Sequence, residues 1–553
     1  MKKILYSLIF LLAFSLWAED LKLDILYTND IHGGIDRIAA TFMNPEFPPQ
    51  LGGGASAATY IKEVRKLSDG KKRESFLFDV GDFFQGRPIG SLTNGEAIIE
   101  YMNAIEYDLT VIGNHEFDSG EETLINTLSK ANFPALACNL FKKGTKELVD
   151  YVQPYLIFNK LGIKIGVIGM ATSDTEKMSF PDHIKNVDFG DEKEALNKYI
   201  KILREEEKVD LLIVTMHAGV PFEPQAEYDK RYGKNAVPEP QYWGLDAQQL
   251  AHEVEGIDII FGGHIHIGLA EPWVDPVTHT LFFSNYANGS NMGHITLLID
   301  KETKTLAGFE YPQRDNALIT LFEEQFIPDP EIDTMISARQ AVVEKGMDDM
   351  IGTAGTFLSR ASVDAQNAMG NFTCEAMIEA TGADFSFLNL GGVRAEIPMG
   401  TVTYRQVFNT MPFDNQIVTI LVDGIMLKKI IETRVAGSRA GLLQAGAKIT
   451  YSRTRSDFDR VTRLEIGGEP WQANKIYKVA TTDFLLQGNA GLTLLTTVPE
   501  SQVIRNEINL RDAMVDYFKK KSPVKVVVDD RWIRDDRSKI SPALQAELER
   551  IKE

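Results

Sequence analysis

Gly113-Asn114-His115-Glu116-Phe117-Asp118 is the stretch of sequence from which the fold can be worked out. It follows the apolar run 109–112 and places an amide, an imidazole and two carboxylates on one short segment. Apolar strands that end in polar loops and lead into amphipathic stretches are typical of an α/β fold. Ligands of such folds bind outside the carboxyl ends of the strands. Four other segments also place a polar cluster after an apolar run: Asp30-Ile31-His32, Gly81-Asp82, His217-Ala218-Gly219 and Gly262-Gly263-His264-Ile265-His266.

The apolar runs divide the chain into two domains. Residues 21–27, 75–80, 109–112, 163–170, 209–216 and 257–261 are predicted strands, and 296–299 with 306–311 form a predicted hairpin. Pro328-Asp329-Pro330 then interrupts regular structure, and 331–345 has the pattern of an amphipathic helix. We therefore predict an α/β domain at 19–325, a helical linker at 326–348, a second domain at 349–530 and a charged helical tail at 531–553.

The N-terminus has the pattern of a targeting segment. Lys2 and Lys3 precede an apolar run at 4–16, and Ala18 stands before polar Glu19. This pattern predicts a signal peptide at 1–18 and an exported protein, either periplasmic or extracellular. A membrane anchor is the alternative, but about 20 apolar residues are needed to span a bilayer, and this run is shorter. No later run is long enough, so no stable membrane span is expected, and the sequence does not indicate an oligomeric state.

Composition excludes several classes of protein. The 58 basic and 78 acidic residues give a formal charge of −20, so a generally basic nucleic-acid surface is excluded. A hydrophobic content of 44% excludes wholesale disorder. The only cysteines, Cys138 and Cys374, make neither a disulfide scaffold nor a thiolate metal cluster.

The nine histidines all lie at or before His294, so a histidine-based site can belong only to the first domain. Asp30 with His32, and His264 with His266, are spaced i, i+2 and point to one side if strand geometry persists. Imidazole and carboxylate ligands suit zinc, manganese or iron rather than calcium. A single histidine after a strand is more often a capping or core residue. The candidate ligands are Asp30, His32, Asp82, Asn114, His217, His264 and His266. They are too many for one tetrahedral ion but suit two ions that share Asp82 as a bridge.

Together these segments resemble the calcineurin-like metallophosphoesterases, and more narrowly the bacterial periplasmic 5′-nucleotidase/UDP-sugar hydrolase family. The resemblance extends over about residues 22–530. It implies an N-terminal four-layer α/β/β/α sandwich and a C-terminal α+β substrate-binding domain. It also implies phosphate release from nucleotides by attack of metal-bound water, with zinc or manganese as the two divalent ions.

The resemblance also assigns roles to individual residues of the first domain. It implies that one ion is held by Asp30, His32, Asp82 and His266. A second ion would be held by Asp82, Asn114, His217 and His264. His115 and Asp118 match the family's catalytic pair, in which Asp118 fixes the tautomer and charge of His115. Some members carry glutamine where His266 stands here.

The second domain would bind the rest of a small-molecule nucleotide. Leu388-Asn389-Leu390-Gly391-Gly392-Val393-Arg394 resembles a family loop in which Asn389, Gly392 and Arg394 reach the substrate. Phe413 and Phe484 match two aromatic residues that enclose the base, although such residues are more often part of a core.

The chain departs from the family pattern at three positions of the second domain. The family's Asn-Met-Gly reads Ala368-Met369-Gly370 here. Ala490 stands where a ribose-binding aspartate is usual, and Val363 stands where an arginine is expected. Arg360 is close enough in sequence to replace that arginine. These departures leave open a 2′,3′-cyclic-nucleotide phosphodiesterase or another small phosphate or sulfur ester hydrolase. An inactive exported binding protein is a further alternative, but such a relic would be expected to have lost Asp82, Asn114 or His115.

Overall fold

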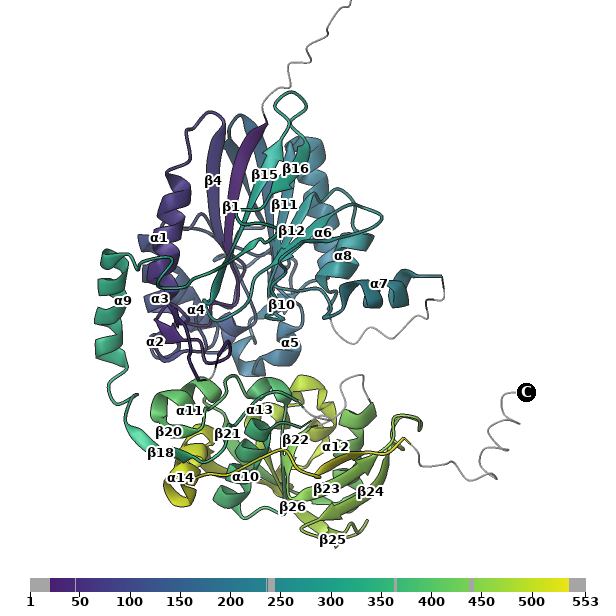
Figure 1. Cartoon of the computed structure of the whole chain (residues 1–553). Coiled ribbons are helices and arrows are strands. Elements are labelled where there is room, and N and C mark those ends of the chain that lie inside the picture. Colours follow the sequence, from purple (N-terminus) through teal and green to yellow (C-terminus); the bar gives the residue numbers. More distant parts are fainter. Residues whose placement is uncertain are drawn as a thin grey trace, which may run out of the picture.

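The computed structural model describes residues 20–44, 46–234, 236, 244–362, 366–436 and 442–536. The predicted signal peptide at 1–18, Val363 and residues 537–553 of the predicted tail lie outside the described residues. Two domains are stacked end to end, and the linker helix α9 (Pro330–Val343) runs along one side of them (Figure 1).

Two sheets form the centre of the first domain. The first sheet contains, in order, β16 (Leu306–Glu310), β15 (Asn291–Ile299), β1 (Leu21–Thr28) and β4 (Arg73–Asp79), with β17 (Leu318–Thr320) beside β15. The second contains β13 (Trp273–Val274), β14 (Leu281–Ser284), β12 (Ile259–Gly262), β11 (Leu211–Met216), β9 (Ile163–Met170) and β8 (Tyr155–Lys160). β1 is parallel to β4, and β9, β11, β12 and β14 are parallel to one another, so their carboxyl ends meet at one edge of each sheet.

The two sheets pack face to face through large apolar side chains. The ring of Phe261 on β12 lies 4.9 Å from Tyr27 on β1 and 5.1 Å from Phe78 on β4, measured between centroids. Successive residues of a strand face opposite sides of the sheet. Ile25 therefore belongs to the core between the sheets, whereas the next residue, Leu26, belongs to the core under the helices.

Helices cover the outer face of each sheet. α1 (Gly53–Arg65) and α3 (Glu96–Ala104) pack on the first sheet, and α6 (Glu192–Lys201) with α8 (Ala247–Glu253) pack on the second. The predicted four-layer α/β/β/α sandwich is therefore confirmed. The smaller elements are β2 (Ile38–Ala39), β3 (Gln50–Leu51), α2 (Pro88–Ser91), β5 (Thr110–Val111), η1 (His115–Phe117), α4 (Glu121–Leu128), β6 (Ala135–Leu136), β7 (Leu140–Lys142), α5 (Thr175–Met178), η2 (Pro181–His183), β10 (Val187–Phe189), η3 (Ile202–Glu206) and α7 (Pro224–Tyr232).

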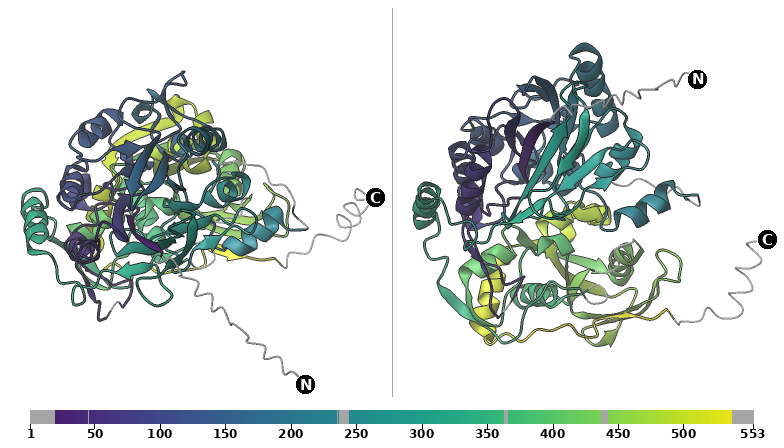
Figure 2. Two further views of the ribbon diagram at one scale, coloured as in Figure 1. Left: turned by 90° about the horizontal axis from the view of Figure 1, so that it is seen from above. Right: turned by 45° about the horizontal axis from the view of Figure 1, so that its top comes forward.

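The linker helix α9 lies against the first domain. The Asp329 side chain caps it by accepting from the backbone N–H groups of Glu331 and Ile332, and Pro330 occupies its first turn. Its buried residues Ile332 and Ile336 join the core beneath the first sheet. Both views of Figure 2 show this teal-green helix outside the layers of the domain.

The second domain is α+β. Its central sheet has the order β22 (Leu443–Ala445), β19 (Phe385–Leu388), β26 (Ile476–Thr482), β21 (Gln416–Asp423), β27 (Val503–Asn509). A smaller sheet has the order β25 (Glu469–Pro470), β24 (Val461–Ile466), β23 (Ala447–Tyr451), β28 (Trp532–Arg534), and β18 (Met350–Ala354) pairs with β20 (Gly400–Thr403). The helical elements are α10 (Ala368–Thr381), η4 (Leu390–Gly392), α11 (Tyr404–Thr410), α12 (Gly424–Ala436), α13 (Asp483–Leu486), η5 (Asn489–Gly491), η6 (Thr493–Thr497), η7 (Glu500–Gln502) and α14 (Leu510–Lys521).

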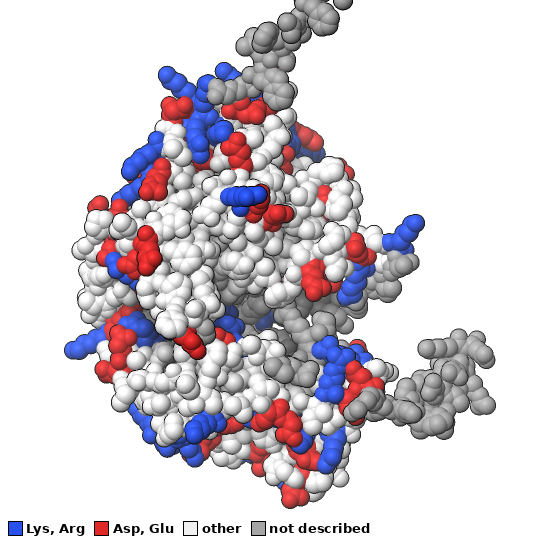
Figure 3. All heavy atoms as spheres, viewed as in Figure 1, with Lys and Arg blue, Asp and Glu red and all other residues white. Residues whose placement is uncertain are grey.

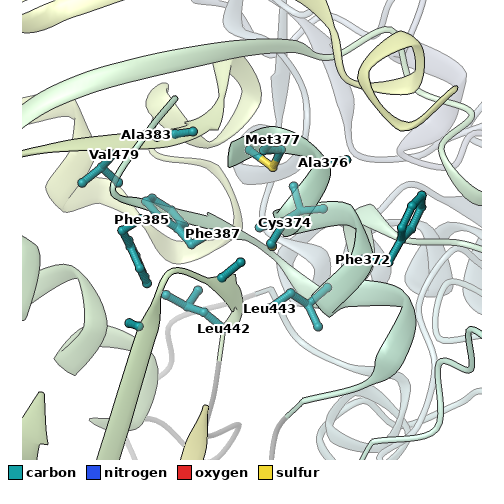
Figure 4. Packing of buried hydrophobic residues seen from close by; sticks show 14 of the residues in the cluster. Phe372, Cys374, Ala376, Met377, Ala383, Phe385, Phe387, Leu442, Leu443 and Val479 are labelled. Atoms are coloured by element: carbon teal, nitrogen blue, oxygen red, sulfur yellow. The ribbon is translucent and has the colours of Figure 1, made fainter. Parts of the chain in front are cut away.

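The core of the second domain forms where α10 crosses the central sheet. Cys374 and Met377 of α10 lie close to Phe385 and Phe387 of β19 (Figure 4). Because β28 pairs with β23, regular structure continues past residue 530, where we expected the second domain to end.

The surface carries both signs of charge. Lys and Arg alternate with Asp and Glu over the face shown in Figure 3, and its described residues include no continuous basic stripe. Each helix in the described part of the chain is too short or too polar to cross a bilayer.

Candidate active site

The five polar loops meet at the carboxyl ends of the strands, as the sequence predicts. The loop after β1 is bonded to the loop after β4, because Asp30 N donates to Gly81 O (2.9 Å) and His32 N donates to Asp82 O (3.0 Å). The loop after β12 joins them, since His264 N donates to Asp30 Oδ2 at 2.9 Å. Segments far apart in the chain therefore supply one buried cluster.

All seven predicted ligands belong to this cluster. Asp30, His32 and His266 form one group in which a ligand atom of each residue lies within 4.8 Å of the others, and Asp82, His217 and His264 form a second. Asn114 Oδ1 lies 2.9 Å from His264 Nδ1. Asp82 stands between the groups: its Oδ2 is 2.9 Å from His217 Nε2 and 3.9 Å from His32 Nε2.

The backbone fixes the orientation of two of these histidines. His32 Nδ1 donates to Gln85 O (2.6 Å), and His217 Nδ1 donates to Val80 O (2.7 Å). With the neutral imidazole donating from Nδ1, the Nε2 lone pair of each ring faces the centre of the cluster. Second-layer bonds of this kind are typical of histidines that bind a metal.

His217 provides a test of whether a cation fits here. Its Nε2 is buried and has no hydrogen-bond partner among the described residues, although Asp82 Oδ2 lies 2.9 Å away. Burial lowers the pKa of His217, but Asp82 and Asp30 outweigh burial and raise that pKa to about 10. The geometry therefore favours a positive charge between imidazole and carboxylate. A proton or a divalent cation can supply it, and the mixed nitrogen and oxygen donors suit a transition metal.

The backbone at these loops is unusual. Asp30, His32, Asp82, His264 and His266 all have φ between 48° and 77°, in the left-handed region that non-glycine residues rarely adopt. The i, i+2 argument assumed that strand geometry continues past Thr28 and Gly262. The strands end at these residues, so this assumption does not hold. His264 and His266 consequently join different groups, because the turn directs them apart. Left-handed residues cost free energy and are concentrated at functional sites.

His115 lies at the edge of the cluster with Asp118. His115 Nδ1 is 2.6 Å from Asp118 Oδ2, and His115 N donates to Asp82 Oδ1 at 2.8 Å. Burial lowers the pKa of His115, but the Asp118 and Asp82 carboxylates outweigh burial and hold that pKa above its usual value. His115 can also form a third candidate group with His32 and Asp82.

The second domain reaches this cluster through two predicted substrate residues. Arg394 Nη2 lies 3.0 Å from His32 Nε2 and 3.4 Å from His266 Nε2. The Phe413 ring is stacked on His115, with centroids 5.8 Å apart and planes at 25°. The site is therefore composed of both domains.

The remaining predicted residues of the second domain lie beside the Arg394 turn or against the domain core. Asn389 precedes the short turn η4, and a Cβ at Gly392 would lie only 3.0 Å from Asn389 Oδ1, so the turn that leads to Arg394 is closely packed. Phe484 and Phe413 are half-buried and also pack against the domain core, so core packing accounts for part of their surroundings. Arg360 Nη1 donates to the Arg394 backbone carbonyl at 2.9 Å.

Two family models match the chain. The model of the calcineurin-like phosphoesterase matches residues 23–268, and the model of the 5′-nucleotidase C-terminal domain matches residues 349–497. This chain belongs to the calcineurin-like phosphoesterases that carry a 5′-nucleotidase C-terminal domain. It is a metal-dependent phosphoester hydrolase, since calcineurin-like phosphoesterases act with divalent metal ions.

Individual relatives cover nearly the whole chain. Protein UshA of Yersinia enterocolitica is 26% identical over 551 residues, which are 92% of this chain and 93% of UshA. A 5′-nucleotidase of Vibrio cholerae is 27% identical over 552 residues, with coverage of 92% and 93%. The 5′-nucleotidase precursor of Thermus thermophilus shares the fold: its TM-score is 0.79 at 23% identity, with 93% of this chain and 99% of that chain covered.

Glu116 is a buried residue of this calcineurin-like site to which the sequence pattern assigns no role. Its carboxylate accepts backbone N–H groups from Asp82 (2.8 Å), Phe83 (2.9 Å) and Gly113 (2.7 Å). Burial, and then the Asp82 carboxylate, raise the pKa of Glu116 to about 8. Glu116 thus ties together the loops that carry Asp82 and Asn114. Its place inside the quoted motif was the only signal that could have revealed it.

Proposed function

We propose that this chain is an exported 5′-nucleotidase that releases phosphate from nucleotides with two divalent ions. The observation that best supports this proposal is that the two ligand groups, with Asp82 between them, face Arg394 and Phe413 of the second domain. A phosphate near the ions can therefore belong to a molecule whose other end lies on an aromatic ring. Export rests on the predicted signal peptide at 1–18 and would place the enzyme in the periplasm or outside the cell.

The donor sets support two ions, zinc or manganese. Asp30, His32, Asp82 and His266 would hold one, and Asp82, Asn114, His217 and His264 the other. Such ions make water nucleophilic at neutral pH and offset charge on a phosphoryl group.

The side chains around the ions have separate tasks. His115 is close enough to the ligand groups to donate a hydrogen bond to a phosphoryl oxygen, and Asp118 holds its ring by Nδ1. Arg394 offers a planar guanidinium suited to phosphate oxygens, and Arg360 supports its backbone. Asn389 and Gly392 position the Arg394 turn, while Phe413 and Phe484 stack on the base, a contact worth about 1–3 kcal/mol per base.

A second candidate function is hydrolysis of cyclic nucleotides or of another small phosphate or sulfur ester. It is favoured by Ala490, because the turn η5 has no carboxylate at the position where the family usually binds ribose. The sulfate thiohydrolase SoxB of Thermus thermophilus shares the fold, with a TM-score of 0.75 at 16% identity and coverage of 94% of this chain and 98% of that chain.

The test is phosphate release from a panel of substrates by metal-stripped protein, with each metal added back. Nucleoside 5′-monophosphates should react faster than 2′,3′-cyclic nucleotides, sugar nucleotides or glycerol phosphate. Faster release from a cyclic nucleotide would favour the second candidate, and equal rates without metal would exclude both.

Metal analysis checks the two-ion arrangement. The purified protein should hold two ions per chain, and Asp82→Asn should lower both metal content and turnover, because Asp82 belongs to both sets. Asp315→Asn is a matched control, since Asp315 has a similar φ of 53° but is exposed. One ion in the active enzyme would contradict the proposal.

A further inference from the structure

We propose that Phe180, from the first domain, contacts the nucleobase and forms a third aromatic wall of the base site. This inference rests on the proposed nucleotidase function and adds a specificity-determining residue to it. Neither the family resemblance nor the spacing of the sequence pointed to Phe180, which lies between α5 and η2.

Phe180 meets the base-binding part of the second domain directly. Its ring centroid lies 5.8 Å from that of Phe484, with the planes at 75°, an edge-to-face contact. The preceding helix α5 contacts η5, the turn that contains Ala490. Figure 1 shows α5 on the side of the first domain that faces α13, the helix that carries Phe484. A base stacked on Phe484 would therefore have Phe180 at its edge.

Polar atoms beside Phe180 indicate the class of ring that fits. Ser179 Oγ and His183 Nδ1 are buried, and the described residues offer neither of them a hydrogen-bond partner. The His183 ring lies 5.2 Å from the Phe180 ring. Buried polar atoms without partners are costly, and these two have almost no accessible surface, so a base could satisfy them only after a small rotation of the Ser179 or His183 side chain. After such a rotation, a heteroaromatic ring with polar edges, as in a nucleobase, would gain hydrogen bonds that a plain aryl group could not form.

The contact also links recognition to the arrangement of the domains. Phe180 and Phe484 belong to different domains, so a base touches both rings only while the domains lie as they do here. A phosphate ester without a base gains nothing from this contact. Phe180 should thus increase the preference for nucleotides over small esters.

Adenosine binding to metal-free protein tests the inference without relying on catalysis. Phe180→Ala should weaken the adenosine Kd about three- to tenfold, the range of a single aromatic contact. Phe180→Tyr should bind as the wild type does. The double variant with Phe484→Ala should lose less than the product of the two single effects, because both rings contact the same base. Phe458→Ala, an exposed phenylalanine elsewhere on the second domain, should bind adenosine normally.

Kinetics give the second readout. Phe180→Ala should lower kcat/KM for adenosine 5′-monophosphate by a similar factor and leave glycerol phosphate unchanged. An unchanged adenosine Kd, or equal losses for both substrates, would overturn the role of Phe180 while nucleotidase activity stands. Wild-type protein that neither binds adenosine nor hydrolyses its monophosphate would remove the proposed function and the inference together. Phe180→Leu covers the case in which the alanine variant fails to fold, and it should show the same loss.

Discussion

His115 contacts the Asp82 and Asp118 carboxylates and the Phe413 ring, yet the resemblance assigns it to the substrate rather than to a metal. His115→Ala should therefore lower kcat by about 10²–10⁴-fold, the contribution of a general acid–base group. Metal content should remain that of the wild type. Turnover and metal content are measured on the same preparation, with the exposed His279→Ala as control. Loss of an ion in His115→Ala would instead show that His115 is a metal ligand, as its candidate group with His32 and Asp82 allows.

Ala490 adopts φ 54° and ψ 28°, in the left-handed region. Aspartate and asparagine tolerate this region better than alanine does, so Ala490→Asp should fold without added strain. The neighbouring Asn489 side chain donates to Phe484 O at 3.0 Å and is committed to the turn. Wild-type enzyme should therefore discriminate weakly between ribo- and deoxyribonucleotides.

The measurement for Ala490 is kcat/KM for a matched ribose and deoxyribose pair. Ala490→Asp should increase the preference for ribose, because a site that binds the hydroxyl penalises its loss. Ala490→Asn introduces a side chain of nearly the same size as aspartate but without its charge, so it separates the effect of charge from that of size. A strong ribose preference in the wild type would show that another group recognises the sugar.

The elements of the first sheet are joined by a buried ion pair. Asp24 on β1 receives two bonds from Arg73 on β4 (2.6 and 2.8 Å) and one from Thr296 on β15 (2.6 Å). Burial raises the pKa of Asp24, but bonds from His294, Arg73 and Thr296 outweigh burial and lower it to about 2. Since the folded-state pKa lies below the unfolded value, the stabilisation is present above about pH 4 and is lost as pH falls towards 2.

Asp24→Asn should therefore reduce the free energy of unfolding at pH 7 by about 2 kcal/mol. Urea denaturation at pH 7 and pH 3 checks this, and the difference between variant and wild type should shrink at pH 3. Asp150→Asn, at an exposed carboxylate, should have little effect at either pH. An equal loss at both pH values would attribute the effect to packing rather than charge.

Element by element, the sequence predicted what local patterns determine. The run 163–170 coincides with β9, and 21–27 lies within β1, because strands buried on both faces read as continuous apolar runs. The approach of Asp30 to Asp82 followed from the parallel pairing of β1 with β4. His217 joins them from the second sheet, because the two sheets pack face to face. The left-handed turns and the three hydrogen bonds to Glu116 could not be predicted from the sequence, since they arise from contacts between loops distant in sequence. The contact of Phe180 with Phe484 becomes apparent only when the two domains are placed together.

At the scale of the molecule, the linker helix is held to the first domain by ion pairs. Arg37 pairs with Asp333 (2.9 Å), Arg339 with Glu100 (2.6 Å) and Lys62 with Asp329 (2.5 Å). Arg405 of the second domain pairs with Glu344 and Asp348 just beyond this helix. Because Arg405 holds residues on both sides of Gly346, a change in domain placement should be absorbed before Glu344, where α9 ends at Val343.

In the proposed function, Arg394 of the second domain binds the phosphate beside the ligand groups of the first domain. Its guanidinium lies between two imidazoles, and its pKa is lowered by burial. An anion bound beside it would therefore be stabilised strongly. Arg394→Ala should lower kcat/KM by about 10–100-fold, the cost of losing one or two charged hydrogen bonds. The loss should be equal for adenosine 5′-monophosphate and glycerol phosphate, because both carry the phosphate.

Phe413→Ala provides the contrast that assigns these roles to opposite ends of one substrate. It should raise KM for the nucleotide and leave glycerol phosphate nearly unchanged, since only the nucleotide has a base to stack. Arg463→Ala removes an exposed arginine of the same domain and should change neither substrate. The comparison uses four kinetic measurements, one for each of the variants Arg394→Ala and Phe413→Ala with each of the two substrates. If Arg394→Ala impaired only the nucleotide, Arg394 would bind the nucleoside, and the phosphate would be held by the first domain alone.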